Sequence, residues 1–208
     1  MTAPERSSER DAALLALLPR VPTQGWTMAA LRDALADIGA DRLDAELLFP
    51  GGPTDLIESF CDLADRWMEQ DTPNLTAERL PNRVREVIAR HLERLRPHRE
   101  AVRRALAQLA LPGRARLALR CTARTVDTIW HVAGDRTADF SWYTKRAILT
   151  GVYSATLLIW LRDDSEEDTA TLAFLDRRLA GVARLHRARR RLTNRLARCR
   201  PGAQAEAA

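Results

Sequence analysis

Apolar residues recur every three or four positions along most of this chain, and prolines and glycines interrupt the recurrence at intervals. This spacing predicts amphipathic α-helices that end at the interruptions. Leucine, alanine and arginine dominate the periodic stretches, β-branched residues are sparse, and no long alternating strand pattern occurs. We therefore predict an all-α bundle of about nine to ten helices. The expected helices cover about residues 5–18, 27–38, 41–48, 53–70, 81–96, 98–109, 112–133, 141–161 and 165–199.

Acidic and basic residues separate along the chain. Residues 27–71 contain eleven acidic residues against three arginines, a net charge of −8, whereas the whole chain of 208 residues carries +5. A polar linker, residues 71–80, follows the acidic part. We predict a single domain in which residues 1–71 form an N-terminal module and residues 72–200 a C-terminal helical region. Residues 201–208 are expected to be a disordered tail.

The first four predicted helices resemble the helix-turn-helix module of TetR-type regulators, in which the short third helix enters the major groove. Here that helix offers Asp41, Asp44 and Glu46 against Arg42. Affinity for DNA depends largely on neutralising phosphates with basic side chains. We therefore predict that this module does not bind nucleic acid. A ligand-sensing TetR-type transcriptional regulator is kept as the alternative function.

The sequence shows no clear membrane-spanning segment, secretory signal or cysteine pair. The longest nearly apolar run, residues 147–161, has fifteen residues, fewer than the roughly 20 that span a bilayer, so we expect a buried helix and only peripheral membrane contact. The N-terminal residues lack the apolar stretch of a secretory signal. Cys61, Cys121 and Cys199 are far apart in sequence and form no CxxC pair. A reducing, cytoplasmic location is expected.

Catalytic motifs are not evident. His131 lies four residues after Asp127 and four before Asp135, a helical spacing that suits a metal or an acid–base site. The sequence has no HExxH pair, nucleophile elbow or glycine-rich phosphate loop beside it. We predict a protein that is not an enzyme and has no catalytic residues, metal or cofactor. An enzyme with an unrecognised metal site is the second alternative.

The densest cluster of aromatic residues lies in residues 130–146, WHVAGDRTADFSWYTKR. It holds two of the five tryptophans, one of the two tyrosines and the single lysine, Lys145. Aromatic rings with a polar group are typical of interfaces and ligand sites. Trp142 and Tyr143 are adjacent, so on a helix they point about 100° apart and cannot both face the core deeply. They are either one core ring and one boundary ring, or rings that contact a partner.

Two segments, LLFPGGPTDLIESFCDLAD (residues 47–65) and VDTIWHVAGDRTADFSWYTKRAILTGVYSATLL (residues 126–158), resemble the ninth coenzyme Q biosynthesis accessory protein family. The resemblance covers roughly residues 10–180. It implies a TetR-like fold and a non-enzymatic role, in which aromatic isoprenoid intermediates of ubiquinone synthesis are bound and presented to the di-iron demethoxyubiquinone hydroxylase. It also implies a homodimer on the inner face of a bacterial inner membrane, the matrix side in eukaryotic relatives.

The resemblance and the aromatic cluster together suggest site residues. Trp130 and Phe140 flank the Gly134-Asp135 turn and are expected to close one end of a lipid pocket, although ordinary sealing of a helix corner is the alternative. Leu149 and Tyr153 are bulky residues on the apolar helix and complete the predicted lipid-binding set. Carried over by position, the residues expected to dock the hydroxylase are Asp127, Ile129, Trp142 and Tyr143.

The last predicted helix combines an apolar stripe with arginines on its other faces. This combination suits an anionic membrane surface. The alternatives are packing on its own domain or on a dimer mate, and nucleic acid. Eukaryotic members of the family have a separate terminal amphipathic helix after a flexible linker, whereas here the last helix is predicted to run on without a linker.

Overall fold

The computed structural model describes residues 4–72, 75, 79–135 and 141–198, with side chains described only up to residue 184 and not for residues 141 and 142. Within these ranges all regular structure is helical, which confirms the all-α prediction. Two short 3₁₀ helices, Arg96–His98 and Glu166–Asp168, lie between α-helices. The α-helices are α1 (Ser8–Leu17), α2 (Val21–Gln24), α3 (Met28–Asp37), α4 (Asp44–Leu48), α5 (Pro53–Asp71), α6 (Leu80–Leu95), α7 (Arg99–Leu109), α8 (Ala115–Val132), α9 (Ser141–Trp160) and α10 (Thr169–Arg198).

Local capping signals account for where the first helices begin. The side chain of Ser7 accepts a hydrogen bond from the backbone N–H of Arg10 at 3.1 Å, so α1 begins at Ser8, three residues later than predicted. Thr27 caps α3 as expected, accepting from the N–H of Ala30 at 3.1 Å. The short helix α2 was not predicted. Pro22 lies in its first turn, where the missing N–H costs nothing.

The start of α10 differs from the prediction. Residues 165–168 resemble a capping box in sequence, yet α10 begins only at Thr169. The carboxylate of Asp168 instead accepts hydrogen bonds from Trp160 Nε1 at 3.1 Å and Arg96 Nε at 3.0 Å, and it pairs with Arg99. Asp168 has φ of 58°, a left-handed conformation that is costly for a residue with a side chain. These contacts offset that cost and hold the start of α10.

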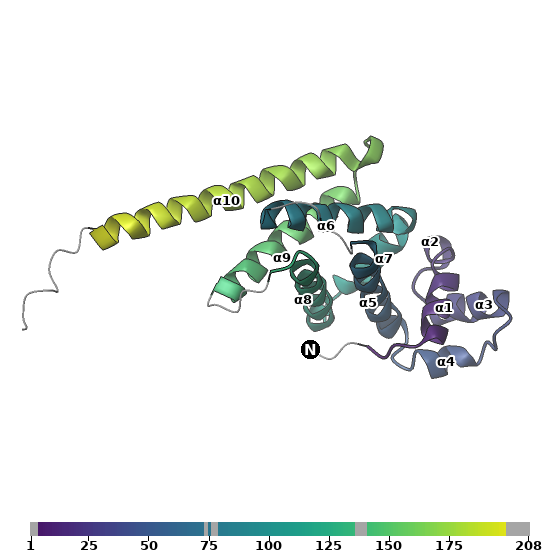
Figure 1. Ribbon diagram of the computed structural model, residues 1–208. Helices are drawn as coiled ribbons and strands as arrows, with labels where there is room; N and C mark the ends of the chain where they lie inside the picture. Colours follow the sequence, from purple (N-terminus) through teal and green to yellow (C-terminus); the bar gives the residue numbers. More distant parts are fainter. Residues whose placement is uncertain (1–3, 73–74, 76–78, 136–140, 199–208) are drawn as a thin grey trace, which may run out of the picture.

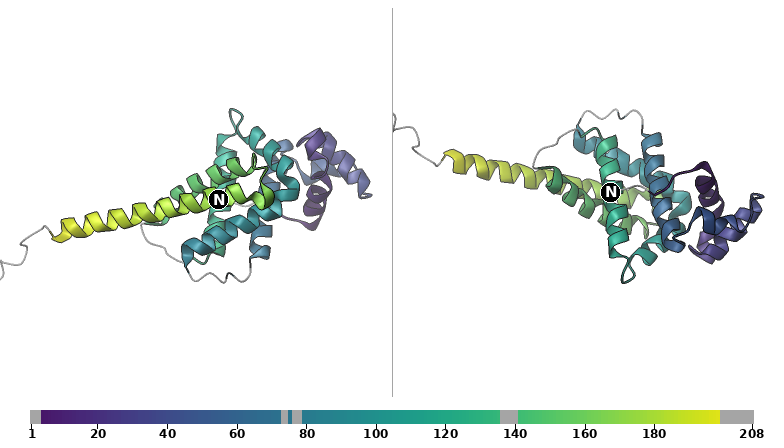
Figure 2. Two further views of the ribbon diagram at one scale, coloured as in Figure 1. Left: turned by 90° about the horizontal axis from the view of Figure 1, so that it is seen from above. Right: turned by 90° about the horizontal axis from the view of Figure 1, so that it is seen from below.

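The helices form a larger body and a smaller N-terminal unit (Figure 1). Helices α1 to α4 gather at one end of the molecule, while α10 starts over α6 and α9 and continues well beyond the body. The views from above and below show the same projection of α10 (Figure 2). One hydrophobic core runs through both parts, and the indole N–H of Trp26 joins them by donating to the Ala101 carbonyl at 3.0 Å.

Buried ion pairs hold α5 against its neighbours. Asp62, nearly fully buried, accepts hydrogen bonds from Arg6 at 2.7 and 2.9 Å and from Arg66 at 3.1 Å. Arg66 also forms two 2.6 Å hydrogen bonds with Asp11 of α1. Part of the negative charge of residues 27–71 is therefore neutralised inside the fold.

The helix α4 presents an unusual surface for a recognition helix. Leu43, at its N-cap, is 73% exposed and Leu47 is 78% exposed. Glu46 pairs with Arg32, and Arg42 pairs with Asp33 at 3.0 Å. Apolar and acidic groups therefore dominate the face that would enter a DNA groove. Among the helices described, none is both long and apolar enough to cross a membrane.

Candidate functional site

A glycine turn at the end of α8 positions Trp130. Gly134 has φ of +76°, a conformation that glycine adopts without strain, and its N–H donates to the His131 carbonyl at 2.9 Å. The N–H of Asp135 donates to the Trp130 carbonyl at 3.1 Å. These bonds end α8 within one turn of Trp130, and the next helix, α9, begins at Ser141. The indole therefore lies where the two helices meet.

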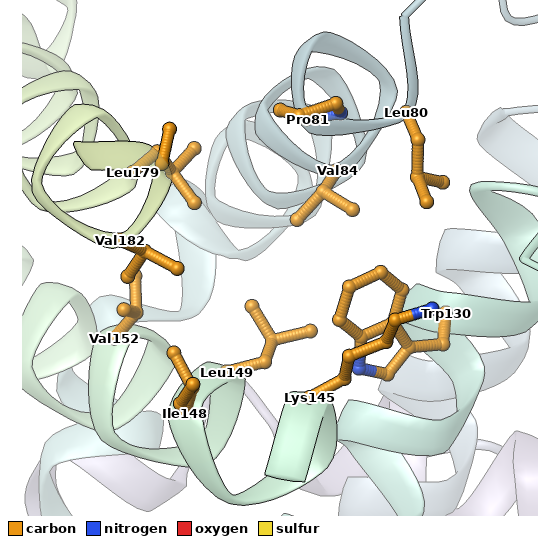
Figure 3. Close-up of a pocket in the computed structure, with 11 residues that line it drawn as sticks. Leu80, Pro81, Val84, Trp130, Lys145, Ile148, Leu149, Val152, Leu179 and Val182 are labelled. Carbon is orange, nitrogen blue, oxygen red and sulfur yellow. The ribbon is translucent and has the colours of Figure 1, made fainter. Parts of the chain in front are cut away.

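Side chains of four helices line a partly open cavity of about 390 Å³ next to this corner. The volume is within the range of small-molecule sites, about 300–1,000 Å³. Lys145, Ile148, Leu149 and Val152 recur at helical spacing and so face the cavity from one side of α9. Figure 3 shows most of the lining side chains converging on the same space. The lining residues are Leu80, Pro81 and Val84 of α6, Trp130 of α8, Lys145, Ile148, Leu149 and Val152 of α9, and Leu179, Val182 and Ala183 of α10.

Only two polar side-chain groups belong to the described lining of this cavity. Lys145 is its single charged residue, and its Nζ lies 3.4 Å from Oδ2 of Asp135. The indole Nε1 of Trp130 is buried and has no hydrogen-bond partner. An unpaired buried donor costs about 1–3 kcal/mol. The indole nitrogen has almost no exposed surface, so Lys145 is the polar side chain that the described lining presents to the cavity.

Two of the four predicted lipid-binding residues line the cavity. Trp130 and Leu149 line the cavity, whereas Phe140 lies outside the described residues. Tyr153 is buried but is not a lining residue, because its hydroxyl is hydrogen-bonded to Nε2 of His91 at 3.1 Å. Burial raises the pKa of Tyr153 well above its usual value. Lipid binding by this set stays a prediction.

The sequence did not identify the walls that α6 and α10 contribute. Leu80, Pro81 and Val84 begin α6 directly after the linker, and Leu179 and Val182 belong to the apolar stripe of α10. Both sets carry a periodic apolar signal, but that signal also fits ordinary core packing. Which faces enclose a cavity depends on how the helices pack.

One predicted docking residue is not on the surface. Ile129 is 0% exposed, because it lies on the same face of α8 as the buried Val126 and Cys121. Its side chain therefore belongs to the core, and we correct its assignment as a surface docking residue. The side chain of Trp142 lies outside the described residues.

The other two docking candidates share a surface where α8 meets α9. Asp127 of α8 is partly exposed and forms an ion pair with Arg146 of α9. Tyr143 is 75% exposed and lies three residues before Arg146, which makes the two side chains neighbours on α9. The structure therefore brings Asp127, Arg146 and Tyr143 together on one face.

The three residues with the spacing of a metal or acid–base site do not form one cluster. Asp127 pairs with Arg146, Asp135 pairs with Lys145, and His131 is exposed. In the described part of the chain, no three or more histidine, cysteine, aspartate or glutamate residues lie together in a way that could hold a metal ion.

Comparisons with known proteins show which proteins this chain resembles. The COQ9 family model matches residues 115–186, which span α8, α9 and the first part of α10. The chain is 36% identical over 180 residues to "Ubiquinone biosynthesis protein COQ9-A, mitochondrial" of Xenopus laevis, covering 80% of this chain and 55% of that protein. It is 31% identical over 175 residues to the COQ9 protein of Homo sapiens, with the same coverage of each chain.

A fungal relative and a solved structure extend the comparison. The coq9 protein of Schizosaccharomyces pombe is 34% identical over 166 residues, which cover 78% of this chain and 65% of the relative. The chain thus spans 55% of the length of the Xenopus and human relatives and 65% of the length of the fungal one. A TetR transcriptional regulator from Nitrosomonas europaea ATCC 19718 superimposes with a TM-score of 0.69 at 22% identity, covering 85% of this chain and 99% of the regulator. That likeness concerns the fold alone. The chain is therefore similar to COQ9 proteins over about four fifths of its length and has a TetR-like fold.

Proposed function

We propose that this protein acts in ubiquinone biosynthesis as a lipid-binding accessory protein without chemistry of its own. It binds aromatic isoprenoid intermediates and presents them to the di-iron demethoxyubiquinone hydroxylase. The observation that carries this proposal is the apolar cavity, because its walls include α8, α9 and α10, the part that the COQ9 family model matches. Each CH₂ group of an isoprenoid buried there would contribute about 0.8 kcal/mol.

Mass spectrometry of co-purifying lipids tests the proposal. Leu149 lines the cavity, so Leu149→Trp fills it, whereas Leu158→Trp adds the same side chain to the exposed face of α9, where Leu158 is 59% exposed. We expect quinones or prenylated phenols with the wild type and Leu158→Trp, and much less with Leu149→Trp. Absence of such lipids from the wild type, or equal amounts in both variants, would contradict the proposal.

We infer that the hydroxylase docks on the surface formed by Asp127, Arg146 and Tyr143. Exposed tyrosines are frequent among residues that dominate binding energy, and a loss of about 2 kcal/mol corresponds to roughly thirtyfold weaker binding. We expect a loss of this order for Tyr143→Ala, measured against purified hydroxylase. Leu47→Ala is the matched control, because Leu47 is equally exposed but lies in the N-terminal unit. Equal effects of both substitutions would exclude this docking surface.

We further propose a peripheral membrane location, on the inner face of a bacterial inner membrane, and a homodimer. The helix α10 runs without a break from Thr169 to Arg198 and projects from the body (Figure 1). Its sequence beyond residue 183 is rich in arginine, and each basic residue near an anionic surface is worth about 1 kcal/mol. Vesicles of phosphatidylcholine with and without phosphatidylglycerol test the membrane contact, which should require the anionic lipid and weaken with salt. Light scattering tests the dimer.

A further inference from the structure

We propose that Cys61 of α5 and Cys121 of α8 form a dithiol site that hydrogen peroxide oxidises to a reversible disulfide. The site lies in the interface between these two helices. It assigns a redox modification to two residues that neither line the cavity nor belong to the proposed docking surface, so it does not depend on the proposed lipid-binding function.

The two cysteines lie on helix faces that pack against each other. Helices α5 and α8 lie side by side in Figure 1 and make the most extensive contact between any two of the described helices. On α5, Glu58, Cys61 and Asp65 are three and four residues apart, so they share one face of the helix. On α8, Cys121 and Arg124 are three residues apart and share a face for the same reason.

Contacts of Arg124 fix how these two faces meet. Arg124 donates a hydrogen bond to the Glu58 carbonyl at 3.2 Å, and its Nε lies 3.5 Å from the carboxylate of Asp65. Glu58 is one turn before Cys61, and Asp65 is one turn after it. The guanidinium of Arg124 therefore spans the position of Cys61, and Cys121, one turn from Arg124, faces the same part of α5.

The thiols of the two cysteines interact directly. A hydrogen bond from the Cys61 thiol is the main cause that lowers the pKa of Cys121, although burial of Cys121 opposes it. The same bond, with burial, raises the pKa of Cys61 well above its usual value. The guanidinium groups of Arg124 and Arg120 lower the pKa of Cys121 further. When the pair loses one proton, Cys121 therefore holds the thiolate, the form that attacks sulfur.

Exposure sets the order of the chemical steps. Cys61 is partly exposed, whereas Cys121 is 3% exposed, so peroxide reacts at Cys61. The sulfur attacks one peroxide oxygen, an S–O bond forms as the O–O bond breaks, and the thiol proton leaves in a water molecule. The Cys121 thiolate then attacks the sulfenic sulfur, so an S–S bond forms, the S–O bond breaks and a second water leaves. Two thiols and one peroxide thus give one disulfide and two waters.

The oxidised state is expected to be transient. Disulfides of proteins in reducing compartments are usually catalytic or redox-sensing, because cellular thiols reduce them again. While it exists, the bond joins α5, which follows the N-terminal unit, to α8, which carries Trp130 at the cavity.

Peptide mapping of the whole chain tests the proposal. Reduced protein is treated with hydrogen peroxide and denatured, its remaining thiols are blocked with N-ethylmaleimide, and its peptides are identified by mass spectrometry. We expect the peptides that contain Cys61 and Cys121 to be joined by a bond that dithiothreitol breaks. If both residues carry the blocking group after peroxide treatment, or if either is joined to Cys199 instead, the proposal is wrong.

Two variants identify the sulfur that closes the bond. Cys121→Ser removes the attacking sulfur, so peroxide should leave a sulfenic acid at Cys61, which dimedone traps. Cys199→Ser is the matched control, because it removes a cysteine outside the pair and should leave the Cys61–Cys121 bond unchanged. Equal dimedone labelling of Cys61 in the wild type and in Cys121→Ser would show that Cys121 does not react.

Oxidation should also stabilise the fold. A disulfide that closes the long loop between residues 61 and 121 restricts the unfolded chain. The oxidised wild type should therefore melt several degrees above the reduced protein, and dithiothreitol should remove the difference. Peroxide should give no such rise in Cys61→Ala, and an equal rise in both proteins would contradict the proposal. Should Cys121→Ser not fold, the mapping of the wild type and Cys61→Ala decide.

Discussion

At the scale of single residues, two buried titratable groups in the core respond to pH in opposite directions. Burial raises the pKa of Asp65 to about 7, even though Arg124 Nε lies 3.5 Å from its carboxylate. Burial lowers the pKa of His91 to about 4, where its Nε2 is hydrogen-bonded to Tyr153. The folded protein therefore favours the neutral form of both groups.

Replacing Asp65 should change how stability depends on pH. The folded state retains the Asp65 proton up to about pH 7, whereas the unfolded chain releases it near 3.8. The folded state binds more protons in this window, so the contribution is fully present below about pH 4 and is lost as pH rises through 7. We expect the melting temperature of Asp65→Asn, relative to the wild type, to rise between pH 4 and pH 8.

Asp62 provides the matched control for this measurement. It is also a buried carboxylate of α5, but it accepts hydrogen bonds from Arg6 and Arg66. Asp62→Asn removes a charge on which those arginines depend and should lower the melting temperature. A difference between Asp65→Asn and the wild type that is the same at both pH values would refute the assignment for Asp65.

His91 has the opposite effect on how stability depends on pH. The folded-state pKa of His91 lies below its usual 6.5, so its contribution to stability is present above pH 6.5 and is lost as pH falls through about 4. Between these limits the effects of Asp65 and His91 oppose each other. The wild type should therefore show a flatter pH dependence than a variant that lacks either group.

At the scale of elements, the connection between α9 and α10 determines whether the cavity is formed. Asp168, in this connection, forms ion pairs with Arg96 and Arg99 where α6 meets α7. The helix α10 supplies one wall of the cavity. We expect Asp168→Ala to reduce the free energy of unfolding by roughly 2–3 kcal/mol, because it removes a buried partner of two arginines. Denaturant unfolding measures the loss, and the content of bound lipid should fall with it.

The neighbouring Asp164 gives the comparison for that variant. It is exposed, in contrast to Asp168, which is nearly buried. Asp164→Ala should therefore change stability by less than about 0.5 kcal/mol. Similar losses for both substitutions would show that Asp168 does not have the anchoring role described.

A substitution next to α4 tests the prediction that the N-terminal module does not bind nucleic acid. Arg42 is the single basic residue in the segment 41–48, and it is paired with Asp33. Arg42→Ala should leave any affinity of the full-length protein for random duplex DNA unchanged within about twofold, because α4 makes no phosphate contact in our interpretation. Filter binding at low salt measures this. A tenfold loss would favour the transcriptional regulator.

At the scale of the whole molecule, the proposed docking surface and the cavity lie close together, and α10 extends from the cavity out of the body. The corner of α8 and α9 holds both Trp130, which lines the cavity, and the exposed Tyr143, so the cavity lies close to the proposed docking surface. The helix α10 leads from the cavity wall out of the body, away from the N-terminal unit (Figure 1). Membrane contact, lipid binding and presentation therefore need no rearrangement of the fold.

Ligand binding should stabilise the whole fold. A ligand that binds only the folded state at 100 times its Kd adds about 2.7 kcal/mol. A benzoquinone with a tail of two prenyl units should therefore raise the melting temperature of the wild type by several degrees, measured by calorimetry. Leu149→Trp, whose cavity is filled, should show no such rise. An equal rise in both would indicate binding elsewhere.

The sequence by itself determined most of the helices and the similarity to COQ9 proteins. Proline and glycine act on the backbone locally, so Pro53 marks the start of α5 and Gly134 the end of α8 without knowledge of the fold. The resemblance to COQ9 proteins was found in residues 47–65 and 126–158, and the order of residues in these segments is also a property of the chain alone. The backbone of α10 confirms the expected continuous last helix to within four residues at its start.

Only the tertiary structure decided which side chains meet. Burial of Ile129, the pairing of Tyr153 with His91 and the unpaired N–H of Trp130 each depend on how separate helices pack. An apolar periodicity shows that a helix has a buried face, but it does not show whether that face meets another side chain or a cavity. The cavity arises where α6, α8, α9 and α10 converge, and no single segment of the sequence contains that information.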